Sequence, residues 1–220
     1  LDNSKLGSLT GPVTIDGTGQ QQDTDPLTYK NLKLTGVENS STEGPAVEMT
    51  ITGGQGHTIK GVAAATQPNA TPAKPHINLS QTSITIAKGA TDVKLTIGES
   101  GSTGGAKVDP AATNVTLKNL TVTEGALDLV AKADNADLAT TVSAANVTFG
   151  AGATGKTATV NLAKHSSISA TALTVKEGAA VTVSGGASLT AGSVSVANGT
   201  IKLGTDAENA TAAFGSTAGN

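Results

Sequence analysis

Apolar and polar residues alternate in short runs along most of this chain, and one pattern keeps returning. It consists of an apolar residue, a Thr or Ser, a second apolar residue, two variable residues and then Gly, as in the stretch LTVKEG that begins at Leu173. Alternation with a period of two is typical of a β-strand that buries one face. Glycine can then turn the chain, because it enters the left-handed region without steric cost. Further copies begin at Met49, Ile84, Leu120, Val147 and Val194, and a looser relative begins at Val13.

A second alternating run follows the glycine, so that the repeating unit is a strand, a glycine corner and another strand. A unit of this length cannot bury its apolar face alone, whereas stacked units share a continuous core. The copies start roughly 20 to 36 residues apart, which is within the range of solenoid repeats. The pattern therefore predicts an all-β fold, a parallel β-solenoid (β-helix) with loops inserted at some corners. The second runs begin at His57, Val93, Ala126, Thr157, Ala180 and Thr200.

The repeat divides the chain into an irregular start and a regular remainder. Residues 1–45 carry the pattern weakly and are expected to form an irregular N-terminal coil or cap, continuous with the solenoid repeats of 46–220. Two segments rich in Pro, Gly, Ser or Ala, 63–75 and 99–112, are predicted to be corner loops. A short helix competes with strand only in 131–145. We expect the chain to be a fragment of a longer protein, and a pair of small β-sandwiches is the alternative fold.

The register of the alternation also assigns individual side chains. Gly89, Gly125, Gly178 and Gly199 are expected at tight corners, with positive φ or with packing that leaves no room for a Cβ. Apolar residues on the same side of successive runs should form the core. The residues expected to point inward are Ile84, Ile86, Leu120, Val122, Val175, Val181, Val183, Val194, Val196, Ile201 and Leu203.

The composition suits a narrow core and argues against several kinds of partner. Tyr29, Phe149 and Phe214 are the only aromatic residues, whereas a β-sandwich of this length fills its core with several rings. All 14 cationic residues are lysines and the net charge is -3, so the arginine forks and the basic field typical of nucleic-acid binding are missing. No stretch approaches the roughly 20 apolar residues of a membrane helix. We therefore expect no nucleic-acid partner and no membrane insertion by this segment.

The histidines give little reason to expect a metal site. His57, His76 and His165 stand singly, without a Cys or an acidic partner at ligand spacing, and the chain contains no Cys at all. His57 is expected to project from a strand corner and His165 from a turn. We expect neither a metal nor another cofactor.

The acidic residues offer only a poor case for catalysis. Asp23 and Asp25 flank Thr24 in a polar corner and form the pair that glycoside hydrolysis would need. Acidic residues are also common in a solvated turn that has no function. Together with Asp16, Asp23 and Asp25 could at most bind a structural calcium ion. We therefore predict no catalytic residue.

Asparagines in the sequence Asn-x-Ser/Thr are frequent, and they have two interpretations. They are potential glycosylation sites, or they are ordinary Asn residues at strand corners in a chain rich in Ser and Thr. The candidates are Asn39, Asn69, Asn78, Asn114, Asn119, Asn146, Asn198 and Asn209.

The style of the repeat resembles that of a known class of secreted proteins. The phrases LTVKEGAAVTVSGGASLTAGSVSVANGTIKLG and NVTLKNLTVTEGA are similar to bacterial autotransporter passengers and haemagglutinin-type adhesins, and more loosely to surface-layer proteins. The resemblance covers about residues 46–203 and lies in the repeat rather than in a functional motif. It implies a right-handed β-helix stalk, export to the bacterial cell surface or the extracellular medium, and a role in adhesion, autoaggregation or coat formation.

Residues and resemblance together favour a non-enzymatic structural or adhesive module whose partners are other copies of itself or host and cell-surface molecules. Two alternatives stay open: a surface-layer or filament subunit that forms ordered arrays, and a β-helix carbohydrate-active enzyme. Outward residues on regular coils and the loops 63–75 and 99–112 are the candidate contact positions, because loops on rigid scaffolds usually carry recognition. The outward candidates are Thr174, Lys176, Thr182, Ser195 and Lys202.

Overall fold

The computed structural model describes residues 13–16, 28–29, 32–36, 46–61, 76–99, 112–131, 136–204 and 209–214 of the chain. Within these residues the protein is nearly all strand, and every pair of named strands is parallel. The predicted parallel β-solenoid is confirmed. The helix that competed within 131–145 is reduced to one 3-10 turn, η1 (Ala136–Leu138), before a strand begins.

The strands follow one another as two alternating series. The first series is β1 (Val13–Asp16), β2 (Thr28–Tyr29), β5 (His76–Ile86), β7 (Thr113–Val122), β9 (Thr140–Phe149), β11 (Ser166–Lys176), β13 (Ser188–Ala197) and β15 (Thr211–Phe214). The second series is β3 (Lys33–Gly36), β6 (Val93–Gly98), β8 (Gly125–Val130), β10 (Ala158–Leu162), β12 (Ala179–Val183) and β14 (Thr200–Leu203). The long strand β4 (Glu48–Gly61) belongs to both, because its first part pairs with β5 and its second part with β6.

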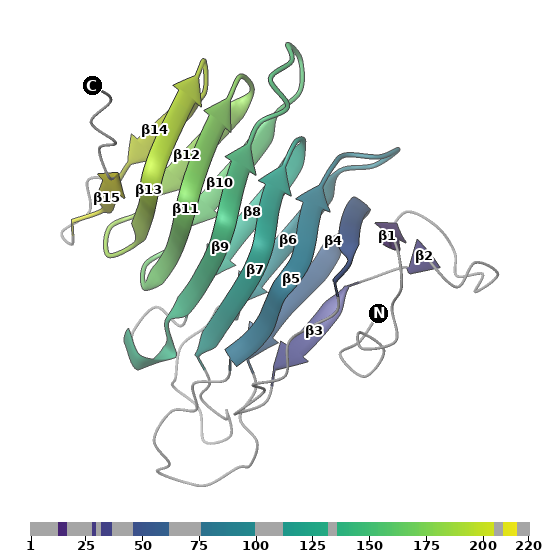
Figure 1. The fold of residues 1–220 in the computed structure, drawn as a ribbon, viewed down its shortest axis with the longest axis horizontal. Coiled ribbons are helices and arrows are strands. Elements are labelled where there is room, and N and C mark those ends of the chain that lie inside the picture. The colour runs from purple at the N-terminus through teal and green to yellow at the C-terminus, as the bar shows by residue number, and fades with distance from the viewer. Residues whose placement is uncertain are drawn as a thin grey trace, which may run out of the picture.

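Each coil of the solenoid therefore takes one strand from each series, and coils stack strand on strand (Figure 1). The front strands in Figure 1 run upward and the rear strands downward while the chain advances to the left, which is a right-handed path. Right-handed crossovers are the usual connection between parallel strands of one sheet, because of the twist of the strands. The second runs expected from the sequence are the rear strands β6, β8, β10, β12 and β14.

Residues in register form columns along the solenoid axis. One column contains Glu48, Ser83, Asn119, Asn146, Ala172 and Ser193, and the step between its successive members shortens from 35 residues to 21. The variable step reflects insertions at corners, which cost little, while the register of the stacked strands is kept. The shortest step, from Ala172 to Ser193, lies at the lower end of the spacing expected from the copies of the repeat.

The front strands of the middle coils bend, which the sequence pattern did not reveal. Alternation of buried and exposed residues breaks where two successive residues face outward, as at Ala145–Asn146 in β9 and Thr171–Ala172 in β11. The register resumes on both sides of the break, so each front strand supplies two flat segments. The repeat recognised in the sequence is the second of these segments. The first segment is a third side of each coil.

The core consists of inward columns of Val, Ile, Leu and Ala. Ile84, Ile86, Leu120, Val122, Val175, Val181 and Val183 are all buried, as predicted. The four predicted inward residues nearest the C-terminal end lie in inward columns but are not fully buried. Val196 and Leu203 are exposed by 53% and 46%, and Val194 and Ile201 are only partly buried. They continue the inward columns, but β15 pairs only with Ser188–Ala191 of β13, and no described strand covers β14 or the second part of β13.

His57 does not project from a corner as expected but is fully buried. It lies in the inward column that continues through Leu95, Leu127, Val160 and Val181. The ring is accommodated because both nitrogens find backbone partners: the N–H of Leu32 donates to Nδ1 at 3.1 Å, and Nε2 lies 2.5 Å from the carbonyl oxygen of Gly53. A buried polar group is tolerated when it is hydrogen-bonded in this way.

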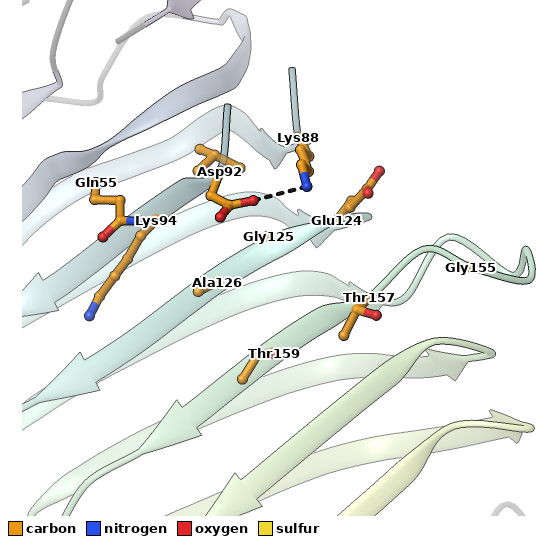
Figure 2. A pocket seen from close by; sticks show the side chains of 11 residues that line it. Gln55, Lys88, Asp92, Lys94, Glu124, Gly125, Ala126, Gly155, Thr157 and Thr159 are labelled. Carbon is orange, nitrogen blue, oxygen red and sulfur yellow. Dashed lines mark ion pairs between the residues drawn. The ribbon is translucent and has the colours of Figure 1, made fainter. Parts of the chain in front are cut away.

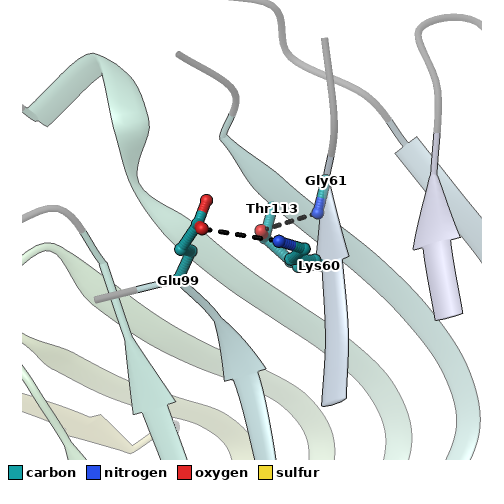
Figure 3. Close-up of polar contacts among 4 residues, drawn as sticks. All are labelled: Lys60, Gly61, Glu99 and Thr113. Atoms are coloured by element: carbon teal, nitrogen blue, oxygen red, sulfur yellow. Dashed lines mark hydrogen bonds and ion pairs between the residues drawn. The ribbon is translucent and has the colours of Figure 1, made fainter. Parts of the chain in front are cut away.

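Buried hydroxyls close the corner at which each rear strand passes into the next front strand. Thr113, Thr140 and Ser166 form one buried column. The Thr113 hydroxyl accepts a hydrogen bond from the Gly61 N–H at 2.9 Å, close to the exposed Lys60–Glu99 ion pair (Figure 3). Thr140 Oγ1 and Ser166 Oγ donate to carbonyl oxygens of the preceding corner. These bonds satisfy backbone groups that the strand ladder leaves free at the turn.

Candidate functional site

The hydroxyl residue of the sequence repeat forms an outward column on the front face. In each copy it stands between two inward apolar residues, so that stacking the copies aligns the hydroxyls. Neighbours in this column are separated by about 4.8 Å, the distance between adjacent strands. Its members are Thr50, Thr85, Thr121, Thr148, Thr174 and Ser195.

The five outward residues selected from the sequence lie on two different faces. Thr174 and Ser195 are neighbours in the front column, whereas Thr182 and Lys202 are neighbours in a column of the rear sheet. Lys176 is exposed at the end of β11, where its backbone forms an antiparallel bridge with Asn198. The five residues therefore do not form one patch. Only two members of a front column that extends over six coils were selected from the sequence, although the Thr or Ser of each repeat copy could have identified the whole column.

The first segments of the front strands carry two further outward columns, which the sequence analysis missed. The columns lie two residues apart, so they run side by side over the same coils. Most of their members are small hydroxyl or amide residues. One column is His76, Asn114, Thr141, Ser167, Ser188 and Thr211, and the other is Asn78, Thr116, Ser143, Ser169, Thr190 and Ala213.

A shallow groove of about 440 Å³ follows the bend of the front strands. We call it the bend groove. One side is the hydroxyl row Thr116, Ser143 and Ser169, in register over β7, β9 and β11. Ala144 and Ala170, which belong to the neighbouring inward column, also line the groove. The remaining lining residues are Ser80, Leu117, Lys118, Ala145 and Thr171.

A second depression, of about 370 Å³, lies over the rear sheet near the glycine corners (Figure 2). Its charged side chains are paired within the described residues. Lys88 contacts Asp92 at 2.9 Å, and this hydrogen bond and the Asp92 charge raise the pKa of Lys88. Lys94 contacts Asp128 at 2.5 Å, just beyond the depression, and Lys156 lies 3.8 Å from Glu124. With each cation beside an acid, the depression favours neither an anionic nor a cationic ligand.

The loop beside this depression contains a motif that the sequence analysis did not single out. Residues 150–157 read GAGATGKT, which fits the G-x-x-x-x-G-K-T spacing of phosphate-binding loops. Such a loop must open a helix, whose N-terminal N–H groups and dipole hold the phosphate. Here the segment joins the strands β9 and β10, and Thr154 donates a hydrogen bond to the carboxylate of Glu177. The motif therefore lacks the context that would make it a phosphate site.

The candidate metal and catalytic residues are not brought together among the described residues. His76 is exposed at the start of β5, with Nε2 2.7 Å from the Thr116 hydroxyl, and His165 lies in a turn at φ 59°, as expected. The described residues contain no group of three or more His, Asp or Glu residues that could hold a metal ion. Asp16 ends β1, whereas Asp23 and Asp25 lie outside the described residues.

The described part of the chain also has no helix of the length and hydropathy needed to cross a membrane. This finding concerns helices alone.

The potential glycosylation sites occupy different environments. Nδ2 of Asn146 donates to Oδ1 of Asn119 at 2.9 Å, and Nδ2 of Asn119 donates to the Ser83 hydroxyl, so both amides already belong to a ladder between coils. A glycan on either amide nitrogen would replace one of its two N–H groups, next to the bond that this nitrogen donates within the ladder. Asn114 and Asn78 accept hydrogen bonds from Thr141 and from the Ser80 backbone, respectively. Asn198 and Asn209 are exposed, and Asn39 and Asn69 lie outside the described residues.

Comparison of the chain with protein-family models, with curated proteins and with solved structures gave no match.

Proposed function

We propose that this chain is a non-enzymatic structural or adhesive module, a rigid β-solenoid stalk whose outward columns make contact with a second copy or with a cell-surface molecule. The observation that carries the proposal is the front column of hydroxyls, which continues over six coils from Thr50 to Ser195. A regular row of uncharged donors and acceptors suits contact with an extended surface better than it suits a reaction at one point.

The scaffold supports such a role because the strands of neighbouring coils satisfy each other's backbone groups. Side chains add further links between coils, as in the ladder from Asn146 through Asn119 and Ser83 to Glu48. A module held together in this way positions its surface residues rigidly, which reduces the entropy lost on contact.

We also propose that the module acts outside the cell, at a bacterial cell surface or in the surrounding medium. The support is the resemblance of the repeat to secreted bacterial adhesins, together with the outward columns of short hydroxyl and amide side chains on the front strands. Export followed by flow cytometry of intact cells with an antibody against the module tests this location. Detection only after permeabilisation would contradict it.

The contact function can be tested by coupling the chain to beads and measuring bead aggregation and binding to epithelial cells. Thr148→Lys places a charge in the middle of the front column, and we expect it to reduce aggregation or binding several-fold. Thr182→Lys makes the same change on the rear sheet, where Thr182 is also half-buried, and serves as the matched control. A version without the segments 63–75 and 99–112, which are predicted to be loops and of which only Glu99 and Ala112 are among the described residues, tests their share.

Two results would contradict the contact function. The first is the absence of aggregation and of cell binding in every version. The second is turnover of a polysaccharide by the purified chain, which would favour the carbohydrate-active enzyme instead.

A subunit of an ordered assembly is the second candidate, favoured by a separate observation. Among the described residues the exposed large apolar side chains are Val196, Leu203 and Phe214, and all three lie at one end of the solenoid. Edge strands that expose apolar residues are prone to pair with another chain. Sedimentation over a range of concentrations distinguishes this candidate, because Val196→Asp with Leu203→Asp should abolish end-to-end association.

A further inference from the structure

We propose that the bend groove binds an extended anionic glycan, a linear sugar chain that carries carboxylate groups. The inference rests on the contact function proposed above and names the chemical class of its partner.

The direction of the groove decides what kind of molecule can lie in it. The groove crosses β7, β9 and β11, so it runs along the solenoid axis and meets one hydroxyl of its row per coil, about every 4.8 Å. A peptide could not add to the sheet here, because β-augmentation needs an unpaired strand edge and these strands are paired on both sides. A linear polymer with repeated hydrogen-bonding groups fits a row of this kind.

The chemistry of the row suits the hydroxyl groups of sugars. A Ser or Thr hydroxyl can both donate and accept, as sugar hydroxyls do. Ser143 and Ser169 are exposed, and neither hydroxyl is hydrogen-bonded to another described residue. The exposed methyl group of Ala145, which also lines the groove, offers apolar contact to the C–H groups of a sugar ring.

Lys118 gives the groove its charge. Its side chain is exposed. Among the described residues it is the only charged one that lines the groove, and no described acid pairs with it. By contrast, Lys88, Lys94 and Lys156 near the rear depression are each paired with a carboxylate. A single unpaired cation suits a ligand with spaced carboxylates, whereas a nucleic acid would call for several phosphate contacts.

The described residues that line the groove include no aromatic side chain, so they offer no ring stacking to a sugar. Each contact is weak, and binding gains from repetition along the polymer and from many copies of the module on one surface. This is the regime expected of an adhesive contact.

The test uses an oligogalacturonate, a linear glycan with one carboxylate per sugar, and its methyl ester, which has the same backbone without the charge. Binding to the full chain is measured by calorimetry or by NMR titration. We expect saturable binding of the acid and weaker binding of the ester. Lys118→Gln should weaken binding of the acid about two- to fivefold, the range of an exposed ion pair. The double variant Ser143→Val with Ser169→Val should weaken both ligands about tenfold.

Lys202→Gln is the matched control, since Lys202 is an exposed lysine on the rear sheet and loses the same charge. Circular dichroism and a melting curve establish that each variant is folded. Absence of saturable binding to the unmodified chain, equal binding of acid and ester, or an equal effect of Lys118→Gln and Lys202→Gln would each overturn the inference. If one of these results is found but coated beads still adhere, the contact function stands and only the glycan is wrong as its ligand. If the beads do not adhere either, both the contact function and the glycan inference are overturned.

Discussion

At the scale of single residues, His57 has the most unusual position in the described part of the chain. It occupies an inward column otherwise built from Leu, Val and Ile, and its ring connects Leu32, just before β3, with Gly53 in β4. Because Nδ1 accepts the Leu32 N–H, that nitrogen carries no proton and Nε2 must be the donor to Gly53. The buried imidazole therefore ties an early segment of the chain to the regular coils.

We predict that His57→Phe destabilises the protein by about 2–5 kcal/mol, because the ring volume is kept while the Leu32 N–H and the Gly53 carbonyl lose their partner in the core. The measurement is the free energy of unfolding in urea. His165→Asn is the control, since Asn tolerates the left-handed conformation of that turn residue and should change stability by less than about 0.5 kcal/mol. Equal effects of the two changes would show that the ring does not tie the two segments together.

Gly178 is the residue on which a corner depends. Its φ is +83°, and a Cβ at this position would overlap the carbonyl oxygen of Lys156. Gly178→Val should cost more than the roughly 1–3 kcal/mol of the backbone strain alone. Lys176 lies two residues before Gly178 and its side chain is exposed, so Lys176→Val should leave the stability nearly unchanged. Thermal unfolding of both variants measures the difference, and equal melting temperatures would refute the role of the corner.

At the scale of the strands, the columns explain why equivalent residues differ in importance. Val175 and Val196 occupy the same column and face the same way, but β13 covers Val175, whereas no described strand covers Val196. Val175 is fully buried and Val196 is 53% exposed. The contribution of a repeat position therefore depends on the presence of the next coil.

We expect Val175→Ala to cost about 1–3 kcal/mol, and Val175→Asp to prevent stable folding, because the charge would be buried without a partner. The same changes at Val196 should each cost less than about 1 kcal/mol, since water already reaches the side chain. Urea unfolding of the four variants tests this. Comparable losses at both positions would mean that Val196 is covered in solution.

At the scale of the whole molecule, stacking in register makes the coil the natural unit of insertion and deletion. Thr171 and Gly192 occupy equivalent places in neighbouring coils, since the residues on either side of them are in register. Stability of such an array is roughly a sum over coils and their interfaces.

Deletion of residues 172–192 should therefore remove one coil and leave a folded, shorter solenoid, with a lower melting temperature because one interface between coils is lost. Deletion of 182–192 removes about half a coil, breaks the register of every later column and should abolish folding of the C-terminal part. Circular dichroism and limited proteolysis distinguish the outcomes. Equal behaviour of the two deletions would contradict a fold built from equivalent coils.

The sequence by itself determined the repeating unit, its strands and most of its inward residues. Alternation is a property of the local backbone, because successive side chains of a strand point to opposite faces whatever lies nearby. This is why the rear strands, and the buried positions in the second segments of β5, β7 and β11 and in β12, could be assigned from the pattern. The tight packing at Gly199 and the positive φ of Gly125 and Gly178 could be anticipated for the same reason.

Only the tertiary structure decided which of these positions are covered and which surfaces form. The burial of His57 depends on Leu32, whose backbone nitrogen lies 3.1 Å from Nδ1 of His57 although the two residues are 25 positions apart in the sequence. Val196 and Leu203 are exposed because no described strand lies over them. The bend groove likewise needs three coils in register, with small residues at the same corner of two of them. These features are contacts between distant segments, which a local pattern of polarity does not encode.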